Sequence, residues 1–146
     1  TIQMSIREDI AANIVTVLTN MSSPITLKKV TRDPFDYERL SNAQFPAAWV
    51  QSGEETREDI SSGVTIRRLG SITYRIIGFV KGGSLDTARN QMIEAIEEII
   101  DTDRTRGGFA LDTQVTSVGT DEGTLEPVGG ITMDVVVRYV YSKGAT

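Results

Sequence analysis

The stretch 131-ITMDVVVRYVY-141 decides the fold, because a large apolar or aromatic residue occupies every second position from 131 to 141. A period of two sustained over this length is typical of a β-strand with one buried and one exposed face. Six apolar or aromatic side chains form the expected buried face: Ile131, Met133, Val135, Val137, Tyr139 and Tyr141. The stretch therefore predicts a sheet with one covered face.

Two helices are predicted to cover that face. Ser5 and Glu8 form an S-x-x-E capping box, and apolar residues then recur every three or four positions as far as Met21. This first helix ends before Pro24, because proline cannot continue a helix. The second helix begins after Ser84, which can cap it. Its apolar stripe is Leu85, Ala88, Met92, Ala95, Ile96 and Ile99.

The remaining segments alternate between short strands and loops. Further strands are expected at 25–32, 45–50, 71–80 and 113–118, with loops at 33–44 and 119–130. Pro46 cannot donate a backbone hydrogen bond, so it belongs at the start of its strand or on an edge. The expected fold class is α+β, a mainly antiparallel sheet with two helices packed on one face. The length predicts a single domain, residues 1–146.

Composition restricts the chemistry. The 146 residues include no cysteine and no histidine, which excludes disulfides, cysteine-ligated zinc, thiol nucleophiles and the usual general base. A net charge of −5 argues against wrapping duplex nucleic acid, because such binding neutralises phosphates. No apolar run is long enough for a transmembrane helix, and no signal peptide is apparent. We therefore expect no enzymatic activity, cofactor or metal.

The densest charge lies in residues 51–70 and predicts a protruding β-hairpin arm. Four carboxylates precede the turn at Ser61-Ser62-Gly63, and two arginines follow it: Glu54, Glu55, Glu58, Asp59, Arg67 and Arg68. Cross-strand charge pairs, at about a few tenths of a kcal/mol each, favour Glu55 opposite Arg67 and Glu54 opposite Arg68. Moving the strand pairing by two residues would instead place Arg57 opposite Arg67, two like charges. Besides this pairing, an equally favoured interpretation is that Arg67 and Arg68 bind a phosphate or a carboxylate of a partner.

The other chemically suggestive groups have simpler interpretations. Three acidic groups lack calcium-loop spacing and are expected to be solvated loop charges: Asp33/Asp36/Glu38, Glu54/Glu55/Glu58/Asp59 and Asp121/Glu122/Glu126. Gly82-Gly83 matches no phosphate-binding motif and predicts a turn before the second helix. Phe45 and Trp49 are expected in the core rather than in a ligand site.

The order of several sequence segments resembles that of one known protein family. It consists of 45-FPAAWV-50, an E-E-x-x-E segment at 54–58, 71-SITYRIIGFVKGG-83 and 84-SLDTARNQMIEAIEEII-100, then 115-VTSVGTDEG-123 and 126-EPVGGITMDVVVRYVY-141. Over most of residues 5–141 the chain resembles the tail terminator, or tail completion, proteins of tailed bacteriophages and related prophage minor tail proteins. The most characteristic part is 115–141.

The resemblance implies a structural role without catalytic residues. Such proteins form hexameric rings on the head-proximal end of the tail tube, stop its polymerisation and join it to the head connector. Implied partners are further copies of the chain, the tube protein, the connector or neck protein and, in contractile tails, the sheath. DNA passes through the ring without sequence-specific binding, and the location is the virion, after assembly in the host cytoplasm. The candidate interface residues are Glu54, Glu55, Arg57, Glu58, Arg67, Arg68, Asp36, Tyr37, Asp121 and Glu122.

Three alternatives remain open at this point. A head–tail connector or neck adaptor would occupy an adjacent ring, commonly twelve-fold rather than six-fold. A monomeric α+β ligand-binding module would need a well-formed apolar pocket. An enzyme that uses carboxylates alone would need a pair of them in a cleft, with shifted pKa values.

Overall fold

The computed structural model of the protein describes residues 5–22, 25–61, 63, 66–123, 125 and 127–142. Pro24, Ser62 and Glu126 lie outside the described residues. The helices are α1 (Ile6–Asn20) and α2 (Leu85–Thr102), and the strands are β1 (Lys29–Thr31), β2 (Ala47–Asp59), β3 (Arg67–Lys81), β4 (Asp112–Thr120) and β5 (Val128–Ser142). Short 3₁₀ turns occupy Tyr37–Arg39 and Asn42–Gln44.

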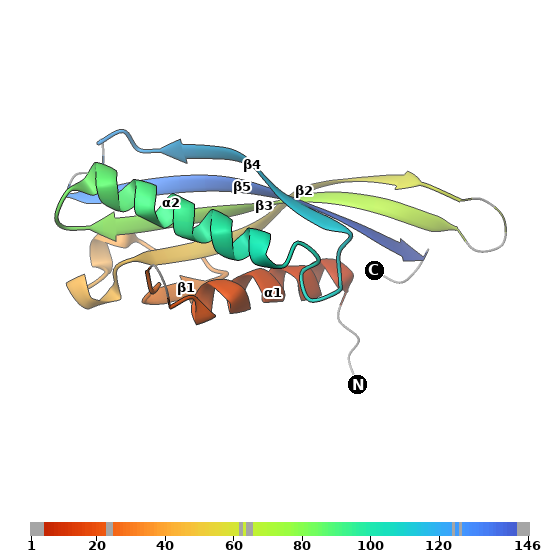
Figure 1. Ribbon diagram of the computed structural model, residues 1–146, viewed down its shortest axis with the longest axis horizontal. Helices are drawn as coiled ribbons and strands as arrows, with labels where there is room; N and C mark the ends of the chain where they lie inside the picture. The colour runs from red at the N-terminus through yellow and green to blue at the C-terminus, as the bar shows by residue number, and fades with distance from the viewer. Residues whose placement is uncertain are drawn as a thin grey trace.

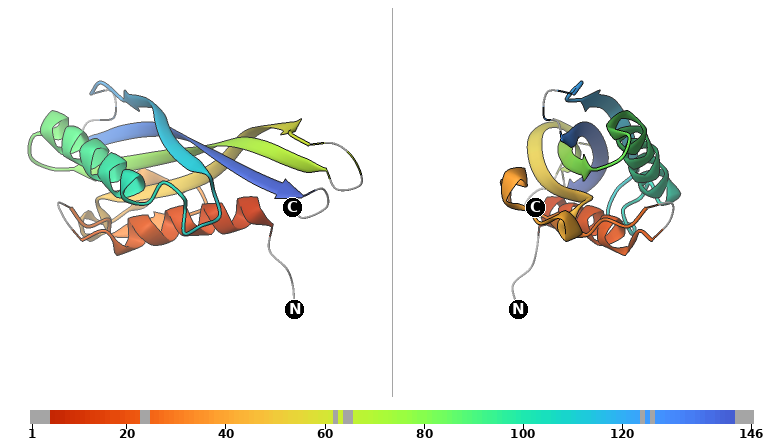
Figure 2. Two further views of the ribbon diagram at one scale, coloured as in Figure 1. Left: turned by 45° about the vertical axis from the view of Figure 1, so that its right-hand side comes forward. Right: turned by 90° about the vertical axis from the view of Figure 1, so that its left-hand side faces the viewer.

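The five strands form one sheet in the order β1-β2-β3-β5-β4. β1 runs parallel to β2, and every other neighbouring pair is antiparallel. Both helices lie on the same face of the sheet, as Figures 1 and 2 show. The predicted fold class is therefore confirmed.

The core lies between the helices and that face. All six β5 side chains predicted to be buried are buried. They meet apolar side chains of α1 and α2, including Ile14, Leu18, Met92 and Ile96. α2 approaches the sheet closely at Gly78, where an added Cβ would lie 2.4 Å from the Met92 Cε. A larger residue at position 78 would therefore displace the end of the Met92 side chain from this contact.

The two helix starts differ in their capping. The Ser5 hydroxyl accepts a hydrogen bond from the Glu8 amide at 3.2 Å, as the capping box predicts. Ser84 stands at the cap position of α2 but makes no side-chain bond to the helix backbone. Its hydroxyl instead lies 3.2 Å from Thr87 Oγ1. Ser84 therefore occupies the N-cap position as expected, but its side chain does not cap the helix.

The strand predicted at 25–32 is much shorter, because β1 covers only Lys29–Thr31. Leu27 is buried and Ile25 packs against the same core, so these two residues anchor the segment without pairing. β1 pairs only with the beginning of β2, Ala47–Trp49, directly after Pro46. The expected placement of Pro46 at the start of its strand is confirmed.

A second apolar cluster lies on the face opposite the helices. Phe79 pairs across from Gly130, and Trp49 across from Ile77, so strand alternation places these side chains away from the main core. The loop predicted at 33–44 folds over them. The cluster comprises Phe35, Tyr37, Leu40, Phe45, Trp49, Ile77, Phe79, Leu125 and Val128. Phe45 is buried and Trp49 half-buried here, so both pack in an apolar cluster as expected.

Candidate functional site

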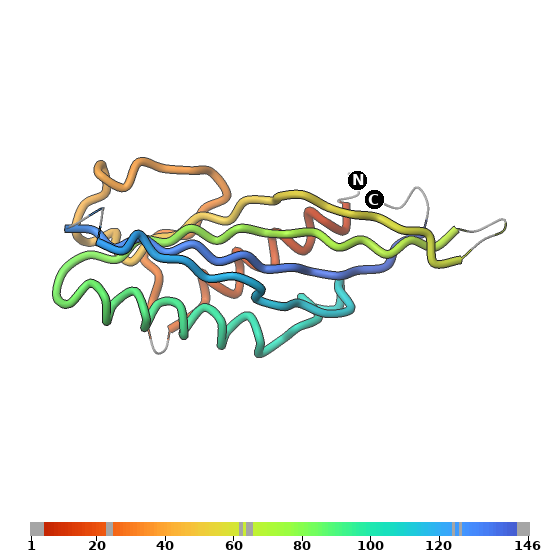
Figure 3. The backbone as a smooth tube through the Cα atoms, turned by 90° about the horizontal axis from the view of Figure 1, so that it is seen from above, coloured from red at the N-terminus to blue at the C-terminus, as the bar shows by residue number. Residues whose placement is uncertain are grey.

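The charged arm extends beyond the helices as the end of three strands. We define the arm as Glu55–Asp59 of β2, Arg67–Ser71 of β3 and Arg138–Ser142 of β5. Figures 1 and 3 show these strand ends running past α1, with β3 between the other two. The arm is therefore a three-stranded extension of the sheet rather than the isolated hairpin expected from residues 51–70.

The predicted charge register of the arm is wrong. Asp59 pairs with Arg68, and Glu55 pairs with Ile72 instead of Arg67. The turn is also wider, since the Ile60 amide donates to the Arg67 carbonyl at 2.9 Å. The register is fixed by which residues face the core, because a one-residue slip would turn every side chain over. Charge pairs worth about a few tenths of a kcal/mol cannot outweigh that.

Glu55 lies at the root of the arm and is buried. Its side chain is 4% exposed, and its Oε1 lies 3.4 Å from the Arg7 Nη1 at the start of α1. The Tyr139 hydroxyl lies 2.9 Å from each carboxylate oxygen, and the Arg57 Nε donates to Oε2. The expectation of a solvated carboxylate at this position is wrong. Two half-exposed cations and a phenol compensate the burial of the charge.

These contacts tie the arm to α1. The Tyr74 hydroxyl donates to the Arg7 carbonyl at 2.7 Å, and the Arg57 guanidinium lies 5.1 Å from the centre of the Tyr141 ring. Burial and the hydrogen bond to Glu55 raise the pKa of Tyr139 to about 12. The bond to Glu55 also raises the pKa of Arg57. Tyr139 therefore stays protonated and Arg57 stays charged at neutral pH.

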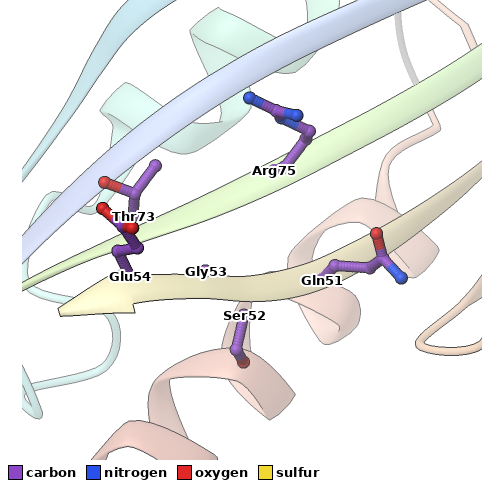
Figure 4. A pocket seen from close by; sticks show the side chains of 6 residues that line it. All are labelled: Gln51, Ser52, Gly53, Glu54, Thr73 and Arg75. Carbon is purple, nitrogen blue, oxygen red and sulfur yellow. The ribbon is translucent and has the colours of Figure 1, made fainter.

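A shallow hollow lies beside the root of the arm, where the β2–β3 register shifts between Ser52 and Glu55. It has a volume of about 340 Å³, and Figure 4 shows its lining: Gln51, Ser52, Gly53, Glu54, Thr73 and Arg75. A Cβ at Gly53 would lie 2.8 Å from the Thr73 carbonyl oxygen, so the bulge requires glycine there. Arg75 pairs with Asp134 at 3.0 Å and is thereby oriented along the sheet.

The remaining arm residues lie on its surface. Glu54, Glu58 and Arg67 are exposed, and Arg68 is half-buried. The Arg68 Nε lies 2.8 Å from Asp59 Oδ1, which raises the pKa of Arg68 through that hydrogen bond. Whether these residues contact a partner stays a prediction.

Asp36 and Tyr37 lie on the loop that folds over the second apolar cluster. Asp36 accepts a hydrogen bond from the Glu38 amide at 2.9 Å and so begins the 3₁₀ turn. The Tyr37 ring stacks on Phe79 with centroids 5.0 Å apart. Beside them is an open apolar hollow of about 340 Å³, lined in part by Trp49 and Leu125.

Asp121 and Glu122 differ sharply although they are adjacent. The Asp121 side chain is 7% exposed and pairs with Arg89 at 3.2 Å, whereas Glu122 is exposed. Burial opposes ionisation of Asp121, but hydrogen bonds from the Gly130 and Leu125 amides outweigh it, and the pKa of Asp121 is lowered. Asp121 thus joins Leu125, Gly130 and Arg89, contrary to the expected solvated loop charge.

The sequence-predicted residues do not form one site. The arm lies at one end of the long axis, whereas Tyr37 and Asp121 line the hollow beside the second apolar cluster, with Asp36 and Glu122 next to them in the chain. Sequence reasoning missed the roles of Arg7 and Arg89. Arg89 had a detectable signal, since it interrupts an apolar helix stripe between Leu85 and Met92.

The described residues hold no group of three or more acidic side chains arranged to bind a metal ion. Within the described part of the chain, neither helix has the length and apolar character needed to cross a membrane.

No protein-family model matches the chain, and no curated protein sequence matches it. One similar solved structure is a chain of a particle described as "Virion of native gene transfer agent (GTA) particle". The likeness has a TM-score of 0.42 and 12% identity, and covers 94% of this chain and 92% of that one. These values are too low for the likeness to bear on the role of this chain.

Proposed function

We propose that this chain is a structural virion protein that forms a ring on the head-proximal end of a phage tail tube. The ring ends tube polymerisation and provides the joint to the head connector. The proposal includes the absence of catalysis, a hexameric state, and contacts with tube and connector proteins. It rests first on the resemblance of residues 115–141 to tail terminators.

The observation that carries the proposal from the structure is the arm. A ring requires two different surfaces of one subunit to meet on its neighbours, and a further surface for each axial partner. The arm supplies a surface at one end of the long axis, and its root is fixed to α1 through Glu55 and Arg7. Such an arm can hold a defined direction toward a partner, which suits a joint.

The mass of the assembled ring tests the stoichiometry. Six chains of 16.0 kDa give about 96 kDa, whereas a twelve-fold connector ring would give about 192 kDa. We expect the hexamer mass for the protein bound to tail tubes. The twelve-fold mass would instead support the neck-adaptor alternative, and a monomer under all conditions, tubes included, would contradict both.

Trimming the arm tests its role. Glu58 pairs with Leu69, so Asn-Gly in place of residues 59–68 would close the hairpin with a two-residue turn and keep Glu55 and Arg57. We expect folded protein whose tails fail to join heads in electron micrographs. Tails of normal length joined to heads would contradict a role for the arm.

One observation favours the monomeric binding module as a second candidate. The apolar hollow beside Tyr37, Trp49 and Leu125 falls at the lower end of the range of small-molecule sites. The test is to add an apolar fluorescent probe and to follow the fluorescence of Trp49. Quenching of Trp49 in a protein that stays monomeric would favour the binding module.

A further inference from the structure

The sheet ends in two long outer edges. β4 is the last strand on one side. On the other side β1 pairs only with Ala47–Trp49, so the outer edge of β2 from Val50 to Asp59 has no strand partner among the described residues. Unpaired strand edges present backbone donors and acceptors that match another β-strand.

The β4 edge lacks most of the usual protection against pairing, although a bulge lies between Val115 and Ser117. Soluble proteins normally guard an edge with charges, prolines or very short strands. Residues 113–120, TQVTSVGT, carry neither a charge nor a proline, and 116–120 are all exposed. Val118 is 44% exposed. The single irregularity is a register shift between Val115 and Ser117.

The β2 edge has the opposite character. Its free part carries four carboxylates and one arginine: Glu54, Glu55, Glu58, Asp59 and Arg57. Two such acidic strands would repel each other, whereas the uncharged stretch of β4 from Thr113 onward opposes no like charge. The two edges of one chain are therefore better partners for each other than β2 is for itself.

Strand polarity also matches. β2, β3, β5 and β4 alternate in direction, so β4 runs opposite to β2. When two copies stand side by side with the same orientation, β2 of one is thus antiparallel to β4 of the other, as the best ladder geometry requires. Following the ladders across the sheet, Ser117 pairs with Asp134, Asp134 with Arg75 and Arg75 with Gln51. Ser117 and Gln51 therefore lie at the same height and on the same face.

We propose that β4 of one copy pairs with the free edge of β2 of the next copy, so that the sheet continues from subunit to subunit. This inference rests on the proposed ring and specifies its subunit contact. The repeat is head-to-tail, because each copy contributes β4 on one side and β2 on the other, and such a contact closes into a ring when the rotation permits.

Cysteine pairs give a direct test, because the chain has no cysteine of its own. Within one chain Gln51 and Ser117 are separated by three strand spacings, about 14 Å, too far for a disulfide. Oxidised assemblies of the Gln51→Cys/Ser117→Cys variant should therefore give a ladder of linked multimers on denaturing gels. The matched control is Ser52→Cys/Ser117→Cys, because Ser52 faces the opposite side of the sheet and should remain unlinked.

Three other outcomes would overturn the inference. Linked dimers from Ser117→Cys alone would indicate a two-fold contact between two β4 edges. Rings of the expected mass that give no linked species in either double variant would leave the proposed function standing and remove this contact. A chain that stays monomeric even with tail tubes would remove the proposed function together with the contact.

A proline provides an independent test. The Asp121 amide donates to the Gly130 carbonyl at 3.1 Å, and ladder alternation then directs the Val118 and Thr120 amides outward. Val118→Pro should therefore leave β4–β5 pairing intact but raise the protein concentration needed for assembly by about tenfold or more. Val118→Thr keeps the amide and should assemble like the wild type. Unchanged assembly of a folded Val118→Pro protein would contradict the inference.

Discussion

The same three strands build two regions held together by different interactions. Beneath the helices, the inner face of β3 and β5 is aliphatic and buried, with Ile76, Met133 and Val135 fully covered. In the arm, that face carries Glu55, Arg57, Tyr139 and Tyr141, which pair and stack with one another. The alternation of side chains continues unchanged while the interactions change from apolar packing to compensated charge.

The difference teaches where stability resides. Burial of apolar area contributes about 25 cal/mol per Å² and supports the helix-covered region. The arm extends past the helices and contacts α1 at its root, where a buried carboxylate has several partners. The net contribution of such an arrangement is small, but its disruption is costly. Removing a side-chain group should therefore lower the stability of the whole fold in the helix-covered region, and mainly local stability in the arm.

The largest effect is expected in the helix-covered region. Ile96 is fully buried between α2 and the sheet, so Ile96→Ala should lower the free energy of unfolding by about 2–5 kcal/mol. Urea denaturation followed by circular dichroism measures this. Glu97 is exposed on the same helix, and Glu97→Ala should change stability by less than about 0.5 kcal/mol. A loss below about 1 kcal/mol for Ile96→Ala would contradict the assigned core.

The next effect is expected at the arm root. Glu55→Gln should cost about 1.5–3 kcal/mol, because hydrogen bonds from Arg57 and Tyr139 to a charged group are lost or weakened. Amide hydrogen exchange should show faster exchange in 55–59 and 67–71 than in α2. The control is Glu54→Gln at the exposed neighbouring position. Uniformly faster exchange throughout the protein would show that the two regions unfold together.

Alkaline pH should weaken the arm before the helix-covered region, without any mutation. Tyr139 has a pKa raised from 10.0 to about 12, which means that folding favours its protonated form. The stabilisation it provides is therefore complete below about pH 10 and is lost as the pH rises through about 12. A titration of tyrosinate absorbance should contain a component near 12 that Tyr139→Phe removes. If the component that Tyr139→Phe removes titrated near pH 10 in the folded wild type, the buried contact of Tyr139 with Glu55 would be contradicted.

The smallest effect is expected at the outer end of the arm. Arg68 pairs with Asp59, whose side chain is 56% exposed. Arg68→Ala should therefore change the free energy of unfolding by at most about 1 kcal/mol. A thermal unfolding curve checks this, with Arg67→Ala as the neighbouring control. A loss as large as that of Glu55→Gln would remove the distinction between the root and the outer end.

Periodicity predicted the helix-covered region well. The alternation of 131–141 and the apolar stripes of both helices depend on local sequence and on burial of one face, and these also determine the fold. The arm was predicted as a projection, but its register was not. The register follows from which residues face the core, and contacts at the arm root, such as Arg7 with Glu55, join residues far apart in sequence.

Buried charge was the main feature that could not be predicted. Glu55 and Asp121 lie in acidic, polar stretches that suggest solvent exposure. Their burial follows from Tyr139 and Arg89, which the chain brings to them from other elements. The fully buried Arg106, whose guanidinium donates to the Ile100 and Asp103 carbonyls at the end of α2, is equally invisible to local pattern. The Glu55–Tyr139 and Asp121–Arg89 contacts join residues of different elements, so local sequence does not predict them.

The unbroken β3–β5 ladder has a mechanical consequence. All fifteen pairs from Arg67–Ser142 to Lys81–Val128 follow one register, without the bulge that interrupts β2. A force applied at the outer end of the arm therefore meets no joint at which the arm could bend independently. It is transmitted as a torque on the whole sheet and on the helices packed against it. We therefore expect the arm, the sheet and the helices to move together as one lever.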